Sequence, residues 1–152
     1  MDSELRELYQ QVILDHNRSP RNFKKLENAN HFAEGFNPLC GDHIDIYATV
    51  DENQIIIDVS FQGNGCAISK SSASLMTSFI KGKSVSEAKI IIEQFQSLVT
   101  GKEMSEDEIE TLGKLAIFQG VKEFPARVKC ASLAWHTLNA ALEKENEKIS
   151  TE

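Results

Sequence analysis

Three cysteines and one aspartate are the residues of this chain best suited to chemistry. Cys40 lies two residues before Asp42, Cys66 follows a Gly-Asn-Gly segment, and Cys130 follows Arg127 by three residues. Three thiolates and one carboxylate form a four-ligand set suited to zinc or iron–sulfur chemistry. No two of the cysteines lie as close in sequence as the ligands of a zinc finger do. The fold must therefore bring these side chains together.

The local sequence indicates how each candidate ligand is presented. Cys66 and Cys130 each precede a stretch with helical periodicity, and at a helix N-terminus the free N–H groups and the helix dipole favour thiolate over thiol. If the chain is extended at Cys40, the side chain of Asp42 shares its face, because residues two apart in a strand point the same way. A buried, unpaired carboxylate is costly, and a metal or a hydrogen-bonding partner would relieve that cost.

Each of these residues also has a purely structural interpretation. Free cysteine often packs as a small hydrophobic residue, and Asp42 could be solvated or cap a turn. Arg127 and Lys129 could steady a thiolate or a transient persulfide, or both could be solvated charges near a helix start. His43 could donate a hydrogen bond to a ligand or replace a displaced ligand.

Length and composition are those of a globular protein. The 152 residues are expected to form a single domain over 1–152, with 41% apolar and 26% charged residues. The net charge of −7 argues against non-specific nucleic-acid binding, which requires a basic surface. The acidic N-terminal tetrapeptide predicts no signal peptide, and no apolar run is long enough for a membrane span. An odd number of cysteines then favours a reducing compartment, so we expect a cytoplasmic protein.

The hydrophobic pattern predicts the elements that position the candidate ligands. Residues 5–16 carry apolar side chains on one helical face, whereas residues 17–39 show no regular pattern. Apolar and polar residues alternate over 44–50 and again over 55–61. These two runs predict an antiparallel hairpin with a turn at 51–53.

Helical periodicity dominates the rest of the sequence. It predicts helices over 66–81 and 131–142. Two further helices are predicted to begin with capping boxes of the pattern Ser-x-x-Glu at Ser84 and Ser105, and the second should continue through Leu115. A small antiparallel sheet covered by helices is an α+β domain.

The cysteine motifs resemble those of the IscU/SufU/NifU-type iron–sulfur cluster assembly proteins. The resemblance spans nearly the whole chain in order and spacing, and it is carried by Ser19-Pro20-Arg21-Asn22-Phe23, Cys40-Gly41-Asp42, Gly63-Asn64-Gly65-Cys66-Ala67-Ile68-Ser69 and Val128-Lys129-Cys130. It implies a SufE/NifU-like α+β fold, with a small three-stranded antiparallel sheet and helices packed on one side. It also implies a metal or cluster at one exposed end, held by Cys40, Asp42, Cys66 and Cys130.

Two departures from the IscU pattern favour the SufU branch of this family. Lys129 stands where IscU-like proteins have a histidine before the third cysteine, and a protonated lysine cannot ligate a metal. The chaperone-recruiting Leu-Pro-Pro-Val-Lys segment is replaced by residues 124–129, and residues 102–123 resemble the insertion of SufU proteins. By resemblance, the protein accepts sulfur from a pyridoxal-phosphate (PLP)-dependent cysteine desulfurase. It then supports cluster assembly for delivery to iron–sulfur apoproteins or downstream assembly proteins.

The resemblance and the ligand chemistry together predict a Zn²⁺ site with Cys40 as the sulfur acceptor. Zinc keeps the cysteine ligands deprotonated. Sulfur transfer requires one thiolate to leave the metal and attack a persulfide, the same displacement as in thiol–disulfide exchange. The loop around Cys40, flanked by Gly41, should move more easily than a helix start, and Arg127 could stabilise the thiolate. Alternatives are a scaffold that assembles a transient [2Fe–2S] cluster on the same ligands, a purely structural zinc site, and a zinc hydrolase. The hydrolase interpretation lacks an open zinc position and a His-Glu-x-x-His motif.

Overall fold

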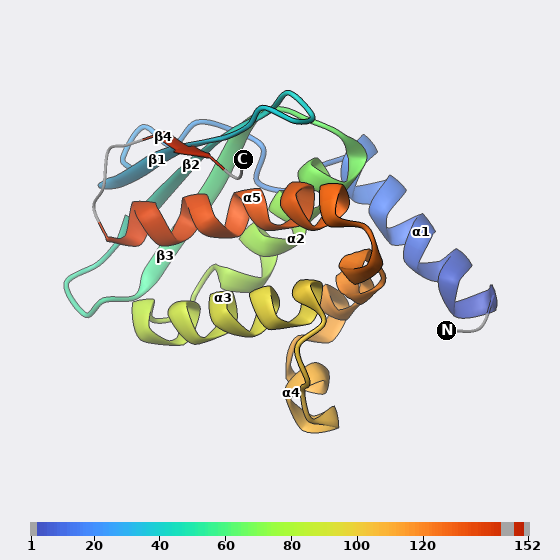
Figure 1. Cartoon of the computed structure of the whole chain (residues 1–152). Coiled ribbons are helices and arrows are strands. Elements are labelled where there is room, and N and C mark those ends of the chain that lie inside the picture. Colours follow the sequence, from blue (N-terminus) through green and yellow to red (C-terminus); the bar gives the residue numbers. More distant parts are fainter. Residues whose placement is uncertain (1–2, 144–147, 151–152) are drawn as a thin grey trace.

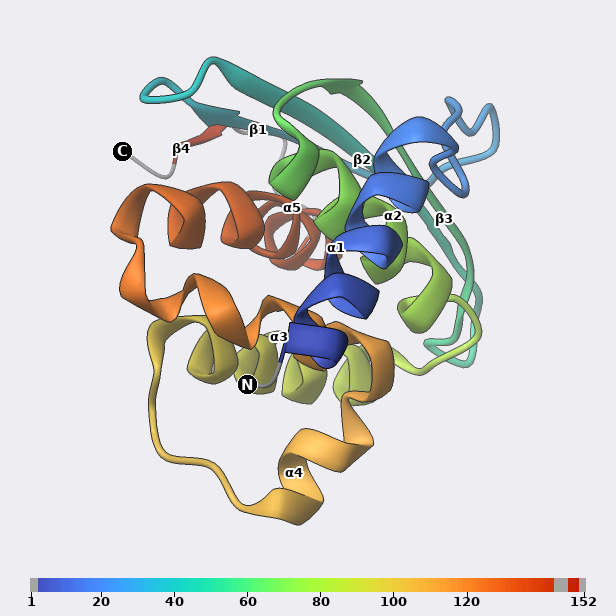
Figure 2. The ribbon, with the colours of Figure 1, turned by 90° about the vertical axis from the view of Figure 1, so that its right-hand side faces the viewer.

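The computed structural model describes residues 3–143 and 148–150. All the helices seen in Figures 1 and 2 lie to one side of the sheet, and no helix of the described residues covers its other face. The strands are β1 (His31–Asn37), β2 (Asp42–Val50), β3 (Ile56–Asn64) and β4 (Lys148–Ser150), in the spatial order β3-β2-β1-β4.

The antiparallel sheet formed by β1, β2 and β3 confirms the expected fold class. β4 pairs in parallel with β1 and adds a short edge strand that was not expected. Residues 144–147, which follow the last predicted helix, lie outside the described residues. Within the described part of the chain, no helix combines the length and apolar character needed to cross a membrane.

β2 and β3 form the predicted hairpin, with one irregularity. Every second residue of β2 from Asp42 to Val50 is buried. The register pairs Thr49 with Asp58 and Val50 with Ile56, so that Ile57 is an extra residue on β3. Because of this bulge Ile56 is buried and Ile57 is exposed, contrary to the strict alternation predicted over 55–61.

β1 lies in the stretch for which the sequence predicts no regular structure. Its buried positions are His31, Ala33, Gly35 and Asn37, which give no alternating hydrophobic signal. The absence of a side chain at Gly35 allows a helix to pack closely, because a Cβ there would collide with the side chain of Thr137. Glycine at position 35 of β1 therefore reflects the close packing of α5 against this strand.

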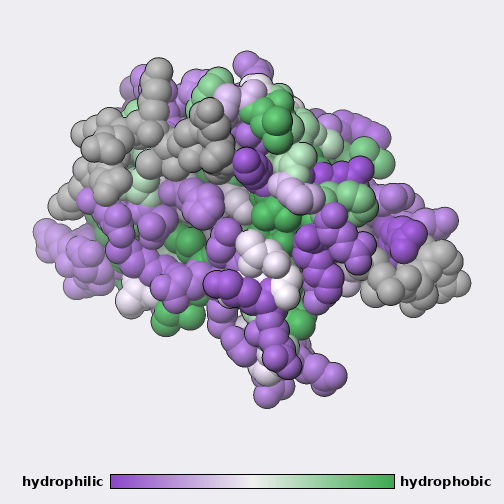
Figure 3. Space-filling model, in the orientation of Figure 1, coloured by the Kyte–Doolittle hydropathy of each residue, from purple (hydrophilic) through white to green (hydrophobic). Residues whose placement is uncertain are grey.

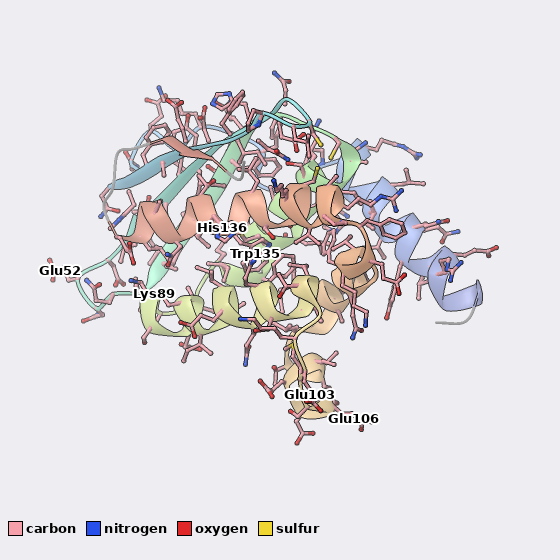
Figure 4. The ribbon with its side chains drawn as sticks, viewed as in Figure 1. Glu52, Lys89, Glu103, Glu106, Trp135 and His136 are labelled. Carbon is pink, nitrogen blue, oxygen red and sulfur yellow. The ribbon has the colours of Figure 1, made fainter. Side chains whose placement is uncertain are left out.

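The helices and their bounds follow the predicted pattern with two differences. They are α1 (Ser3–Arg18), α2 (Ala67–Ile80), α3 (Val85–Thr100), α4 (Glu106–Thr111), the 3₁₀ helix η1 (Gly113–Glu123) and α5 (Pro125–Leu142). Both capping boxes, at Ser84 and Ser105, are formed as predicted. α4 projects from the body of the molecule, with Glu103 and Glu106 near its tip (Figures 2 and 4).

The helix expected to run from Ser105 through Leu115 ends at Thr111. Gly113 adopts a positive φ of 54°, which does not continue an α-helix, and the chain proceeds as η1. Apolar residues recur at every third position from there, and a helix with three residues per turn places them in one line. These buried residues are Leu112, Leu115, Phe118 and Val121.

The core lies between the sheet and the helices. Trp135 of α5 lies between α5 and α3 (Figure 4), where its ring stacks on Phe95 with centroids 4.3 Å apart. Its indole Nε1–H donates to Ser72 Oγ of α2 at 3.0 Å, and Ser72 Oγ in turn donates to the Ala131 carbonyl. The surface over α4 is mostly hydrophilic, with hydrophobic side chains in small separate groups (Figure 3).

Candidate metal centre

A tight hairpin places Cys40 and Asp42 at one end of the sheet. Asn37 and Asp42 form the last pair of the β1–β2 ladder, and residues 38–41 make the turn between them. Gly41 adopts a φ of 73° in this turn, a conformation that glycine adopts without strain. Cys40 is consequently exposed in the turn, whereas Asp42 is fully buried at the start of β2.

Cys66 is the N-cap residue of α2, which confirms its predicted place at a helix N-terminus. Its Sγ accepts a hydrogen bond from the Ser69 backbone N–H at 3.4 Å. Its own backbone N–H donates to Asp42 Oδ1 at 2.9 Å. Gly65 permits this close approach, because a Cβ there would lie 2.9 Å from Asp42 Oδ1.

Cys130 is not at a helix start, contrary to the prediction. Proline suits the first position of a helix, and α5 begins at Pro125, which leaves Cys130 more than one turn inside. Burial raises the pKa of the Cys130 thiol, and the neighbouring Cys40, Cys66 and Asp42 raise it further. The helix N-terminus therefore does not activate this thiol, and in the absence of a cation its neutral form is favoured.

The structure brings three of the four expected ligands into one cluster. Ligand atoms of Cys40, Asp42 and Cys130 all lie within 4.8 Å of one another, and the Cys40 and Cys130 sulfurs are 3.3 Å apart. Cys66 lies at the border of this cluster, joined to it by its N–H bond to Asp42. Yellow sulfur atoms gather beside the start of α2 in Figure 4. The arrangement is a cysteine–aspartate site able to hold a thiophilic metal.

Asn37 is a member of this cluster that the sequence did not reveal. Its Nδ2 lies 3.4 Å from Asp42 Oδ2 and 3.7 Å from Cys130 Sγ. The only available signal was its position five residues before Asp42. That signal acquires meaning only when the hairpin register is known.

Arg127 and Lys129 occupy the first turns of α5. Arg127 is exposed, and its guanidinium lies over the ring of Phe124, 4.6 Å from the ring centroid. Lys129 is half-buried. Arg127 is one helical turn before Cys130, so its side chain starts on the same side of the helix.

His43 lies on the opposite face of the sheet from the cysteines. Successive strand residues point to opposite faces, and Asp42 is buried while His43 is only partly so. Its Nε2 is 3.2 Å from Asp45 Oδ1 and 3.5 Å from Glu34 Oε2. The suggestion that His43 assists the metal ligands is therefore wrong for this structure.

Two of the other histidines, His16 and His31, have structural partners, as expected. His16 Nδ1 lies 2.7 Å from Ser74 Oγ, and His31 Nδ1 lies 2.7 Å from the Ala141 carbonyl. Burial lowers the pKa of His136. None of these three residues belongs to the cysteine–aspartate cluster.

The Pro-Arg-Asn segment has a structural role in docking α1 to the body of the molecule. The Arg21 backbone N–H donates to Ser74 Oγ at 2.8 Å, and Asn22 Nδ2 donates to Thr77 Oγ1 at 3.1 Å. The Asn22 carbonyl accepts from the Phe61 N–H of β3. Small polar residues of α2 thus accept hydrogen bonds from the Pro-Arg-Asn segment and hold it against the helix.

The sequence matches the family model of the NifU-like N terminal domain over residues 8–131. It is 42% identical over 144 residues to the zinc-dependent sulfurtransferase SufU of Bacillus subtilis (strain 168), with 95% of each chain covered. It is 37% identical over 142 residues to the iron-sulfur cluster assembly scaffold protein IscU of Streptococcus pyogenes serotype M1, with 93% of this chain and 87% of that protein covered.

Solved structures share the fold. The crystal structure of FiSufU from Fervidobacterium islandicum AW-1 superposes with a TM-score of 0.81 at 38% identity, covering 93% of this chain and 99% of that one. The N-terminal part of a NifU-like protein from Brucella abortus gives a TM-score of 0.79 at 17% identity, covering 93% and 96%. The second match shows likeness of fold alone.

Proposed function

Because this chain belongs to the NifU-like N terminal domain family, we propose that it serves iron–sulfur cluster assembly as a zinc-dependent acceptor of persulfide sulfur. The family resemblance seen in the sequence is confirmed by these matches. The Bacillus subtilis relative, which is named a zinc-dependent sulfurtransferase, supports the acceptor role. The observation that carries the proposal is the convergence of Cys40, Asp42 and Cys130 within 4.8 Å.

The donor set and its surroundings fit Zn²⁺. Thiolates of Cys40, Cys66 and Cys130 and the carboxylate of Asp42 would be the ligands, a type of set that zinc binds tetrahedrally. Asp42 is fully buried, and among the described residues no ion pair includes it. A bound cation would relieve the cost of that buried charge. Zinc would also keep the thiols deprotonated.

Cys40 is the proposed sulfur acceptor because it is the most accessible of the three thiols. It is exposed, whereas Cys66 is partly and Cys130 almost completely buried. The Cys40 thiolate would attack the outer sulfur of a desulfurase persulfide. A new S–S bond forms on Cys40 while the S–S bond of the donor breaks, and the desulfurase cysteine leaves as a thiolate. The exchange needs no external oxidant or reductant.

Mass spectrometry of the zinc-loaded protein after reaction with a persulfurated PLP-dependent cysteine desulfurase tests this proposal. We expect a sulfane adduct on Cys40 in the wild type and none on Cys40→Ser. Sulfane sulfur found only on Cys66 or Cys130 would reject Cys40 as the acceptor. Metal analysis of Asp42→Ala, in which we expect zinc to be lost, checks the ligand set independently of transfer.

Arg127 is a proposed stabiliser of the acceptor thiolate or the product persulfide. Its guanidinium is exposed beside Phe124 and so is free to turn toward a docked partner. Arg127→Ala should lower the rate of sulfur transfer while zinc content stays at the wild-type level. Equal rates in the two proteins would dismiss this role.

A second candidate function is assembly of a transient [2Fe–2S] cluster on the same ligands. Relatives named IscU scaffold proteins favour it. Anaerobic reconstitution with iron and sulfide separates the two functions: a stable cluster that transfers to iron–sulfur apoproteins supports the scaffold, and persistent zinc supports the acceptor. In either case the proposed partners are a cysteine desulfurase and downstream assembly proteins, and the proposed location is the cytoplasm, where thiols stay reduced.

A further inference from the structure

We propose that Asn37 is a positioning residue that holds Asp42 and Cys130 in place and so leaves Cys40 as the ligand that takes up sulfur. This inference rests on the proposed zinc-dependent function and adds to it the residue that selects among the thiols. Asn37 is fully buried at the end of β1. Its amide nitrogen lies 3.4 Å from Asp42 Oδ2 and 3.7 Å from Cys130 Sγ.

The hairpin fixes Asn37 relative to Asp42 through the backbone. The two residues are direct cross-strand partners, and both side chains point to the buried face. Side chains of such partners start about 4.5–5.5 Å apart, within reach of a hydrogen bond. Cys40 lies outside this ladder, in the turn that connects the two strands. The ladder therefore fixes the position of Asp42, whereas Cys40 is not held by it.

The amide of Asn37 can serve both ligands at once. It carries two N–H donors, so one hydrogen can point to the carboxylate and the other to the sulfur. Because the amide is neutral, it leaves the negative charge of the ligands available to a metal. Hydrogen-bonding groups behind metal ligands orient those ligands and tune the metal. Donation to Cys130 Sγ withdraws electron density from that sulfur and makes it a weaker nucleophile than it would be without this bond.

The remaining atom of the amide argues for a role in the site. Asn37 Oδ1 is buried and has no hydrogen-bond partner among the described residues. A buried carbonyl without a partner is a cost to folding. The side chain is thus poorly suited to a purely structural role in the core, and its productive contacts are those to Asp42 and Cys130.

The test compares the full-length wild type with Asn37→Leu, which has a similar volume and no donors, and with Asn37→Ala, which removes the amide without adding a charge. The matched control is Asn30→Leu, just before the other end of β1, where the Asn30 amide bonds the Val50 backbone and no other described residue. Far-UV circular dichroism selects the variants that fold. If Asn37→Leu does not fold, Asn37→Ala provides the comparison.

Three measurements are made on each protein. Chelator competition should show zinc affinity about 10–100-fold weaker in both Asn37 variants. The thiolate-to-metal charge-transfer band of the Co²⁺-loaded variants should move to longer wavelength, because a sulfur without its hydrogen bond is a better electron donor. Mass spectrometry should find persulfide on Cys130 as well as on Cys40. The Asn30→Leu control should change thermal stability only. Its zinc affinity, its Co²⁺ charge-transfer band and the cysteine that carries the persulfide should be those of the wild type.

Each result separates this inference from the function on which it rests. An unmoved charge-transfer band with unchanged zinc affinity overturns the positioning role, even if thermal stability falls. Unchanged placement of sulfur on Cys40 alone overturns the selection among thiols. If the variants shift the band while the wild type accepts no sulfur, the acceptor function fails and the positioning of the ligands stands. A wild type without any thiolate–Co²⁺ band would reject both.

Discussion

Asp42 illustrates at the scale of a residue how a buried charge is accommodated. Its two carboxylate oxygens accept hydrogen bonds from the Cys66 backbone N–H and the Asn37 amide. Both donors are neutral, so they reduce the desolvation cost without neutralising the carboxylate. The sequence predicted Asp42 as a ligand from its spacing to Cys40. It could not reveal Asn37, because an amide acquires this role only through a cross-strand pairing that the sequence did not indicate.

A pH-dependent loss of stability is predicted at His16. Burial lowers the pKa of His16, and the positive charge of Arg21 lowers it further. The unfolded chain therefore binds the proton first as pH falls. The stabilising contribution is complete above the unfolded value of about 6.5 and is lost as pH falls through the lower folded value.

Urea unfolding of the metal-free, reduced protein between pH 7.5 and pH 5 measures this effect. We expect the free energy of unfolding to decrease toward acid pH through the contribution of this group. His16→Asn, which can keep a partner for Ser74 Oγ, should show a shallower pH dependence. An equally steep decrease in the variant would contradict the assignment.

At the scale of elements, the sequence predicted those whose buried face is apolar and missed those built from small or polar residues. β2 and α3 carry regular apolar patterns and lie where expected. β1 buries His31, Gly35 and Asn37, so it shows no hydrophobic alternation. The start of α5 was placed too late because Pro125 marks the first turn, whereas the apolar pattern begins only near Cys130.

The two capping boxes provide a matched pair of substitutions. Ser84 caps α3, which contributes Phe95 and other side chains to the core, whereas Ser105 caps α4, which has no buried residue. Ser84→Ala should lower the free energy of unfolding by about 1 kcal/mol. Ser105→Ala should leave the global value nearly unchanged and increase only local hydrogen exchange in α4. Equal global losses in chemical denaturation would contradict this distinction.

The indole of Trp135 links α5 to α2 and α3, and we predict that these contacts stabilise the fold. Trp135→Phe keeps an aromatic ring against Phe95 but loses volume and the hydrogen bond to Ser72. We expect a loss of about 1–3 kcal/mol in the free energy of unfolding. A double-mutant cycle with Ser72→Ala should show non-additivity, because the two residues share one hydrogen bond. Strict additivity would show that the bond contributes nothing.

At the scale of the whole molecule, the contact between Gly35 of β1 and Thr137 of α5 sets the distance between sheet and helix. A Cβ at Gly35 would collide with the Thr137 side chain. Gly35→Ala should therefore cost about 1–3 kcal/mol. It should also weaken zinc binding, since β1 carries Asn37 and α5 carries Cys130. Zinc titration and chemical denaturation measure the two effects.

The control for this prediction is the double variant Gly35→Ala/Thr137→Ala. Removing the threonine hydroxyl removes the closest collision with the new Cβ, so stability and zinc affinity should return part of the way toward those of Thr137→Ala alone. If the double variant is as impaired as the sum of the single variants, the contact does not set the spacing between sheet and helix.

The separation of 90 residues between Cys40 and Cys130 has a consequence for biosynthesis. The hairpin and α2 can leave the ribosome with three of the candidate ligands, but the fourth arrives only when α5 has been translated. A nascent chain cannot offer the full ligand set before that moment. Ribosome-bound chains stalled before Cys130 should therefore hold zinc far more weakly than the released protein, which makes metal loading a step that follows synthesis.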